Sequence, residues 1–96
     1  MRILVVEDGK KVAGFIKKGL EEESYAVDVA YDGEDGLHFG SEGQYDLIIL
    51  DIMLPKIDGL EILSQLREQG KDTPILLLTA KDAVDYRVTG LNRSAD

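Results

Sequence analysis

The chain has 96 residues, a formal net charge of −8 from 11 basic and 19 acidic residues, and no cysteine. A chain of this length forms one small domain, and without cysteine it has no disulfides, thiolate metal ligands or thiol nucleophiles. The acidic excess argues against binding to nucleic acid, which needs a basic surface, and no apolar run approaches the length of a membrane span, so we expect a cytoplasmic protein.

The first predicted strand, 3–6, is short and wholly apolar, which is typical of a strand buried on both faces of a parallel sheet. It ends at Glu7-Asp8-Gly9, and an amphipathic helix follows. Apolar residues recur in that helix at helical spacing and form one predicted buried stripe: Val12, Phe15, Ile16, Gly19 and Leu20.

The second strand is predicted over 25–31, where apolar and other residues alternate around Asp28, as in a strand at the edge of a sheet. A weak, glycine-containing helix over about 33–42 follows it. The third strand, 47–50, is again wholly apolar, and it ends at Asp51.

Asp58 predicts the start of the third helix, because its side chain can cap the helix and Glu61 stands at the position of a capping-box partner. The fourth strand is predicted at 74–79. A fourth helix would begin at Asp82, with apolar residues at helical spacing: Val84, Val88 and Leu91.

Four strand–helix units in alternation predict an α/β fold, a doubly wound parallel sheet with right-handed crossovers. The strand at 25–31 belongs at an edge and the others inside, which gives the order 2-1-3-4. In such sheets ligands bind outside the carboxyl ends of the strands. We therefore expect Glu7, Asp8 and Asp51 to converge at one crevice, with the hydroxyl of Thr79 on the same rim.

Three carboxylates at one crevice repel one another unless a cation neutralises them or one of them is protonated. Oxygen-only ligands suit a hard divalent ion such as Mg²⁺. The pattern leaves a plainer alternative open, in which Asp8 caps a helix and Asp51 belongs to a turn. Thr79, taken alone, reads as a turn residue.

Four motifs together resemble the receiver domain of bacterial two-component response regulators, which has a CheY-like, flavodoxin-like fold. They are Val-Val-Glu-Asp at 5–8, Leu-Ile-Ile-Leu-Asp-Ile-Met-Leu-Pro at 47–55, Asp58-Gly59, and Leu-Leu-Thr-Ala at 77–80. The likeness is to the OmpR/PhoB-type subfamily, which carries a winged-helix DNA-binding domain, and it covers essentially the whole chain.

The resemblance implies that Asp51 accepts a phosphoryl group from the phosphohistidine of a sensor histidine kinase. Glu7, Asp8, Asp51 and the backbone carbonyl of Met53 would hold Mg²⁺, and Thr79 would be the switch hydroxyl that binds the phosphoryl group. A domain of this kind is a phosphoacceptor rather than an enzyme, with self-catalysed transfer at most.

The chain departs from this family at its carboxyl end. Receiver domains continue to a fifth strand that carries a lysine and then to a fifth helix, so we expect residues 1–96 to be a truncated receiver domain that lacks both. The edge of the fourth strand and the sheet face beside the first helix would then be uncovered, and we expect a homo-oligomer that forms through one of them.

Two alternatives belong to other classes of function. A truncated, receiver-derived interaction or dimerisation module would lack effective phospho-switching. A flavodoxin-like redox domain or an aspartyl phosphatase fits poorly, because Glu7-Asp8-Gly9 is unlike a flavin phosphate loop and Met53 stands where the phosphatase needs a second aspartate.

Overall fold

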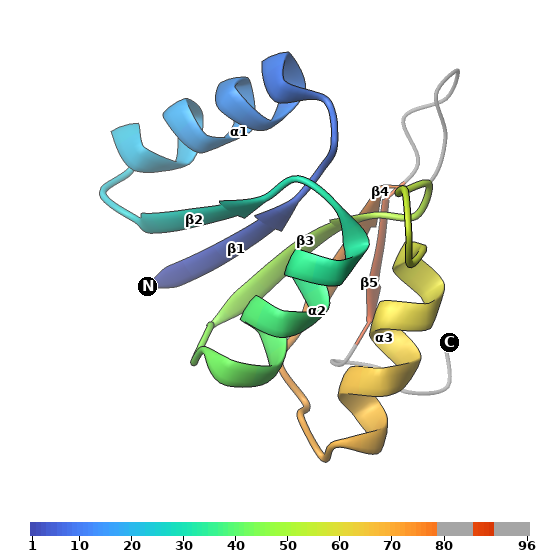
Figure 1. Cartoon of the computed structure of the whole chain (residues 1–96). Coiled ribbons are helices and arrows are strands. Elements are labelled where there is room, and N and C mark those ends of the chain that lie inside the picture. Colours follow the sequence, from blue (N-terminus) through green and yellow to red (C-terminus); the bar gives the residue numbers. More distant parts are fainter. Residues whose placement is uncertain (79–85, 90–96) are drawn as a thin grey trace.

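The computed structural model describes residues 1–78 and 86–89 (Figure 1). Their elements are, in chain order, β1 (Arg2–Val6), α1 (Lys10–Glu22), β2 (Ala26–Ala30), α2 (Gly33–Glu42), β3 (Leu47–Asp51), α3 (Gly59–Glu68), β4 (Ile75–Leu78) and β5 (Tyr86–Thr89). Strands and helices alternate from β1 to β4, as the apolar patterns predict. None of the helices in these described ranges combines the length and apolar character needed to span a membrane.

One sheet holds these strands in the order β2-β1-β3-β4-β5. β1 pairs in parallel with both β2 and β3, and β4 pairs in parallel with β3. The register places Val6, the last residue of β1, opposite Ala30 on one side and opposite Leu50 on the other, so the three strands end within one residue of each other. The predicted doubly wound sheet and its order 2-1-3-4 are confirmed.

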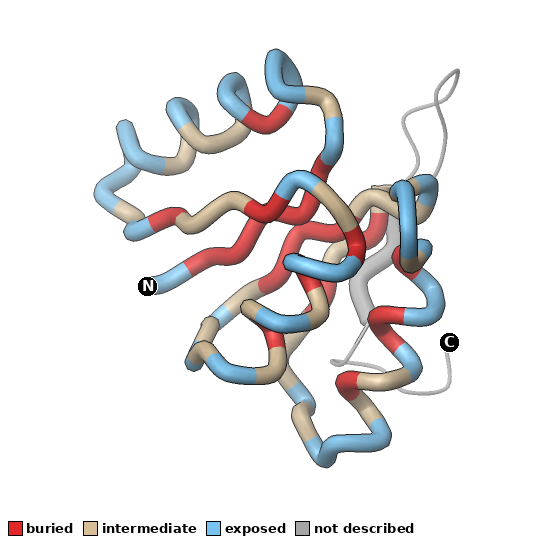
Figure 2. The backbone as a smooth tube through the Cα atoms, viewed as in Figure 1, coloured by how far each residue is buried: buried red, intermediate tan, exposed pale blue. Residues whose placement is uncertain are grey.

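The helices lie on both faces of the sheet: α1 covers β1 and β2 on one face, while α2 and α3 cover the other (Figure 1). Figure 2 shows that the buried positions are concentrated in the strands. The core beneath α2 and α3 is the larger one and includes Leu4, Val6, Ile48, Leu50, Ile62, Leu66, Ile75 and Leu77. The core beneath α1 consists of Ile3, Val5, Val27 and Ile49. Burial of both faces explains why residues 3–6 of β1 and 47–50 of β3 are wholly apolar.

The predicted fourth helix is wrong at residues 86–89, which form β5 and pair with β4 in antiparallel orientation. Val88, an apolar position of that predicted helix, lies opposite Leu76. The other positions named for it lie outside the described residues: Asp82, Val84 and Leu91. The sequence Tyr-Arg-Val-Thr favours a strand, and the pairing satisfies backbone groups that β4 would otherwise expose. The expected uncovered edge of the fourth strand is therefore covered.

The buried stripe of α1 is narrower than the sequence predicts. Ala13 is buried, and Ile16 and Leu20 pack partly buried against the sheet, but Val12 is exposed and Phe15 is 81% exposed. Spacings of three and four residues place 13, 16 and 20 on one side of the helix, which leaves Phe15 beside that side. The predicted stripe missed Ala13 because a small side chain gives a weak apolar signal.

Aspartates begin the two helices on the other face. Asp32 accepts a hydrogen bond from the Asp35 N–H at 2.8 Å, and Asp58 accepts one from the Glu61 N–H at 2.9 Å. The predicted cap of α3 is confirmed, and each cap satisfies a donor that the first turn of a helix leaves unpaired. The Glu61 carboxylate, expected as the other half of a capping box, accepts a hydrogen bond from Gln65.

Candidate functional site

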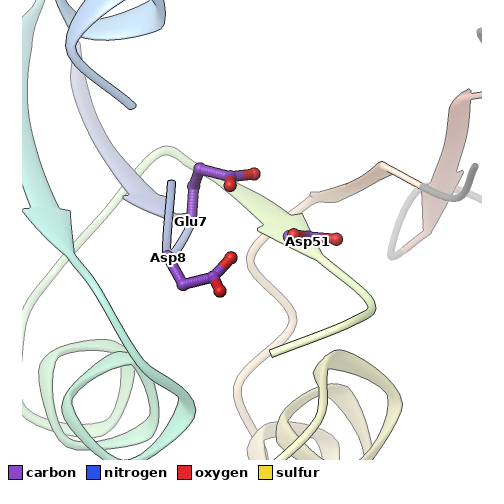
Figure 3. Close-up of side chains that lie close together, drawn as sticks. All are labelled: Glu7, Asp8 and Asp51. Carbon is purple, nitrogen blue, oxygen red and sulfur yellow. The ribbon is translucent and has the colours of Figure 1, made fainter. Parts of the chain in front are cut away.

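Three acidic side chains come together at the carboxyl ends of two neighbouring strands. Glu7 and Asp8 follow β1 directly, Asp51 is the last residue of β3, and these strands pair in parallel. One carboxylate oxygen from each side chain lies within 4.8 Å of the others. Figure 3 shows the three side chains around one space. The predicted convergence of these residues is confirmed.

Glu7 is the most enclosed of the three acids, with 8% of its surface exposed. Its burial raises the pKa of its carboxyl above the ordinary value, and Asp51 and Asp8 raise that pKa further. A hydrogen bond of 2.8 Å from the Gly9 N–H to Glu7 Oε2 opposes the rise. Among the described residues no ion pair neutralises the negative charge of the crevice, which is the electrostatic condition for binding a cation.

Asp51 is oriented by the loop that follows it. Its Oδ1 accepts a hydrogen bond of 3.0 Å from the Met53 N–H. The Ile52 N–H donates to the Leu78 carbonyl at 3.2 Å, which extends the pairing of β3 with β4 to the edge of the site. The carboxylate of Asp51 thus stands at the end of a strand that is paired on both sides, and the Met53 N–H orients it.

The plainer alternative for these acids holds for Asp51 only. Asp51 does make a turn-like contact with the Met53 N–H. The residue that caps α1, however, is Gly9, which has no side chain to accept a hydrogen bond, so Asp8 is not the cap of this helix. Asp8 is exposed, does not cap the helix and lies next to two other carboxylates. These features suit a ligand for a hard cation better than a residue that marks the start of a helix.

The donor set fits a magnesium ion. Three carboxylates offer one oxygen each, and Mg²⁺ prefers oxygen ligands and retains several waters. The resemblance adds the carbonyl of Met53 to the ligands; this residue follows Asp51 by two positions and is 56% exposed. A groove beside Asp8 is lined by this same loop, with Ile52, Met53 and Pro55 among its residues. Thr79, the expected switch hydroxyl, lies outside the described residues.

One contact near the site has no signal in the sequence. Lys56, which reads as a solvated lysine, places its Nζ 3.4 Å from Asp32 Oδ2 and 3.7 Å from Glu34 Oε1. Lys56 is far in the chain from both of its acidic partners, and no sequence motif marks the contact. Only the side-by-side arrangement of the β2–α2 and β3–α3 connections brings them together.

Comparisons with known proteins identify the family. The model of the response regulator receiver domain matches residues 3–96. The transcriptional regulatory protein PcoR of Escherichia coli is 54% identical over 95 residues, which are 99% of this chain and 42% of PcoR. The structure of the Francisella response regulator 1452 receiver domain is 40% identical, with a TM-score of 0.81 over 85% of this chain and 68% of that chain.

A second solved structure bears on the site. Response regulator protein TrrA from Thermotoga maritima, in complex with Mg²⁺-BeF, is 47% identical with a TM-score of 0.77, over 82% of this chain and 69% of that chain. This chain spans about two fifths of the length of the curated relatives it matches, 42% of PcoR and 43% of DltR from Streptococcus agalactiae. The chain belongs to the response regulator receiver domain family.

Proposed function

We propose that this receiver domain accepts a phosphoryl group on Asp51. The observation that carries the proposal is the convergence of Glu7, Asp8 and Asp51, whose oxygens lie within 4.8 Å of one another. We assign Asp51 as the nucleophile on the strength of its motif; its carboxylate stands at the end of β3, and its Oδ1 accepts a hydrogen bond from the Met53 N–H. The matches to regulators, and to one in complex with Mg²⁺-BeF, do not favour the alternative of an interaction module without phospho-switching.

In the proposed reaction, an oxygen of Asp51 attacks the phosphorus of a phosphohistidine. The new O–P bond forms an acyl phosphate, and the electron pair of the broken P–N bond goes to the imidazole nitrogen. Glu7, Asp8, Asp51 and the Met53 carbonyl would hold Mg²⁺, which supplies positive charge for the oxygens of the transferring group. Thr79 is assigned to bind a phosphoryl oxygen on the strength of its motif.

The phosphoryl donor in this proposal is a sensor histidine kinase, and the reaction takes place in the cytoplasm. Membership of the receiver domain family supports both statements. The domain is a phosphoacceptor that catalyses at most its own modification. With a net charge of −8, residues 1–96 offer little attraction for nucleic acid, so we assign them no direct contact with it.

Intact mass spectrometry tests the proposal directly. We expect one phosphoryl adduct when the chain is incubated with Mg²⁺ and acetyl phosphate, and none when EDTA is present. Asp51→Asn should remove the adduct, because it removes the nucleophilic oxygen. The matched control is Asp58→Asn, since Asp58 lines the neighbouring groove and asparagine also caps helices. An adduct that persists in Asp51→Asn contradicts the assignment.

We also propose that two copies associate through the sheet face beside α1. On that face α1 covers β1 and β2, whereas Leu47, Leu76 and Leu78 remain only partly buried. The sequence predicts two uncovered surfaces, the edge of the fourth strand and this face. Because β5 pairs with β4, only this face remains as the predicted interface. Sedimentation should show a dimer that Leu76→Lys dissociates, and a monomer at high concentration contradicts the proposal.

A further inference from the structure

The loop between β3 and α3, residues 52–58, carries the Met53 carbonyl and is fixed at its base. The Ile52 N–H donates to the Leu78 carbonyl at 3.2 Å, and the Gly59 N–H donates to the Ile52 carbonyl at 2.8 Å. A Cβ at Gly59 would lie 2.5 Å from the Asp51 carbonyl oxygen, so the start of α3 closes tightly on the end of β3. These contacts hold the two ends of the loop together.

The same loop is fixed at its apex by the turn that begins α2. The Gly33 N–H donates to the Pro55 carbonyl at 3.2 Å. A Cβ on Gly33 would lie 1.7 Å from the Ile57 carbonyl oxygen, so only glycine permits this approach of two backbones. The apex of the loop therefore rests on α2, an element that does not itself contribute to the acidic crevice.

An ion-pair cluster reinforces this contact. Lys56 has φ 72°, a left-handed conformation that is unfavourable for most residues other than glycine. Its Nζ lies 3.4 Å from Asp32 and 3.7 Å from Glu34. The pKa of Lys56 is raised, first by Asp32 and then by Glu34. A lysine persists in an unfavourable conformation where its surroundings stabilise it. Here the Pro55 carbonyl, directly before Lys56, accepts hydrogen bonds from the Gly33 and Ile57 N–H groups, and the two ion pairs add to these contacts.

We propose that the turn Asp32–Glu34 is a positioning element for the metal site, acting through Lys56 and Gly33 on the backbone of Met53. Met53 lies between the fixed base and the fixed apex of the loop, and its exposed side chain offers little packing of its own. Without the apex contact, the Met53 carbonyl would sample more orientations and bind the cation less well. This inference rests on the proposed function, because it assumes that the Met53 carbonyl is a ligand.

The test is the affinity for Mg²⁺, measured by calorimetry on the whole chain. Lys56→Asn keeps a residue that tolerates the left-handed conformation but removes the ammonium. We expect it to weaken Mg²⁺ binding about two- to fivefold, the range that exposed ion pairs allow, with Lys56→Arg close to wild type. The sign is diagnostic. If Lys56 acted only as a nearby positive charge, its removal would strengthen Mg²⁺ binding.

Two further arms separate positioning from other effects. At about 1 M NaCl, where ion pairs are screened, the difference between wild type and Lys56→Asn should shrink. In the background Asp32→Asn/Glu34→Gln, adding Lys56→Asn should no longer weaken binding, because the partners of the ammonium are already gone. Asparagine at position 32 retains the cap of α2, so that helix stays intact.

Gly33→Ala tests the backbone contact and should weaken Mg²⁺ binding more than Lys56→Asn. Gly14→Ala is its control, since a Cβ there meets nothing within 4 Å. Hydrogen exchange of β1 and β3 amides establishes that each variant is folded. Mg²⁺ binding in Lys56→Asn that is as tight as in wild type overturns the inference. Absence of Mg²⁺ binding in wild type instead overturns the proposed function on which it rests.

Discussion

Acidic side chains on the two sides of β1, Asp28 at the edge strand and three acids at the crevice, differ in what neutralises them. At the edge strand, Asp28 accepts hydrogen bonds from Arg2 at 2.8 Å and from Tyr45 at 2.7 Å. At the crevice, Glu7 and Asp51 face each other and Asp8. None of the ion pairs found among the described residues involves these three acids.

The pKa values follow this difference. The hydrogen bond from Tyr45, and then Arg2, hold the pKa of Asp28 below its ordinary value. Burial and the neighbouring carboxylates raise the pKa of Glu7. Asp28 is therefore a structural acid whose charge is already compensated, whereas the crevice gains from a cation. The comparison separates acids that stabilise the fold from acids that serve a ligand.

Of the substitutions that test this comparison, Asp8→Asn should have the largest effect, and the effect is on Mg²⁺ affinity. It removes one ligand charge from the crevice, and we expect Mg²⁺ affinity to fall at least about tenfold, as changes at metal sites commonly cause. Calorimetric titration of Mg²⁺ measures this change. Arg2→Gln, at the compensated acid, should leave Mg²⁺ affinity within about twofold of wild type, because exposed ion pairs contribute little. Equal losses of Mg²⁺ affinity in both variants would remove the distinction between Asp28 and the crevice acids.

Tyr45→Phe tests Asp28, the compensated acid. It deletes the hydroxyl that donates to Asp28 and should lower the free energy of unfolding by about 1 kcal/mol, measured by urea denaturation. The pKa of the Tyr45 hydroxyl, raised to about 12 by burial and by Asp28, indicates that this hydroxyl stays protonated at neutral pH. Mg²⁺ affinity should not change, and a marked change would link the two regions.

The same substitution has a pH signature. A carboxyl with a lowered pKa in the folded state contributes stability above its unfolded pKa of 3.8, and that stability is lost as pH falls through the folded pKa. Tyr45→Phe removes the largest cause of the lowering, so the pKa of Asp28 should rise toward 3.8. NMR titration of the Asp28 carboxyl measures this shift, and an unchanged value contradicts the assigned cause.

Glu7→Gln should give the smallest effect on stability in the absence of Mg²⁺, with a sign opposite to that of Tyr45→Phe. The raised pKa of Glu7 means that the folded state binds a proton more readily than the unfolded state. Without Mg²⁺, stability contributed by this group is therefore present below pH 4.5 and falls as pH rises through the folded pKa. At pH 7, Glu7→Gln should be slightly more stable than wild type without Mg²⁺, and less stabilised when Mg²⁺ is added.

Much of this fold is predictable because its strands are buried on both faces. The apolar runs at 3–6 and 47–50 leave few other places for these segments, and alternation of strands and helices then sets the order of the sheet. Convergence of Glu7 with Asp51 follows from that order without any knowledge of side-chain contacts. The site was therefore predicted at the level of topology.

The features that the sequence does not predict depend on tertiary contacts that compete with local preferences. The sequence at 84–91 has helical spacing, but residues 86–89 pair with β4, because an exposed strand edge competes with local propensity. Phe15 reads as core and lies in solvent, since the helix turns Ala13 toward the sheet. Lys56 meets Asp32 only through tertiary packing, which leaves no trace in local sequence.

The most direct test of the central claim is an NMR titration of the Glu7 carboxyl with and without Mg²⁺. The account predicts that Mg²⁺ lowers the pKa of Glu7 from its raised value, because a cation in the crevice favours the carboxylate, while the pKa of Asp28 stays unchanged. If Mg²⁺ leaves the pKa of Glu7 where it is, or shifts Asp28 equally, the three acids do not share a cation and the account is contradicted.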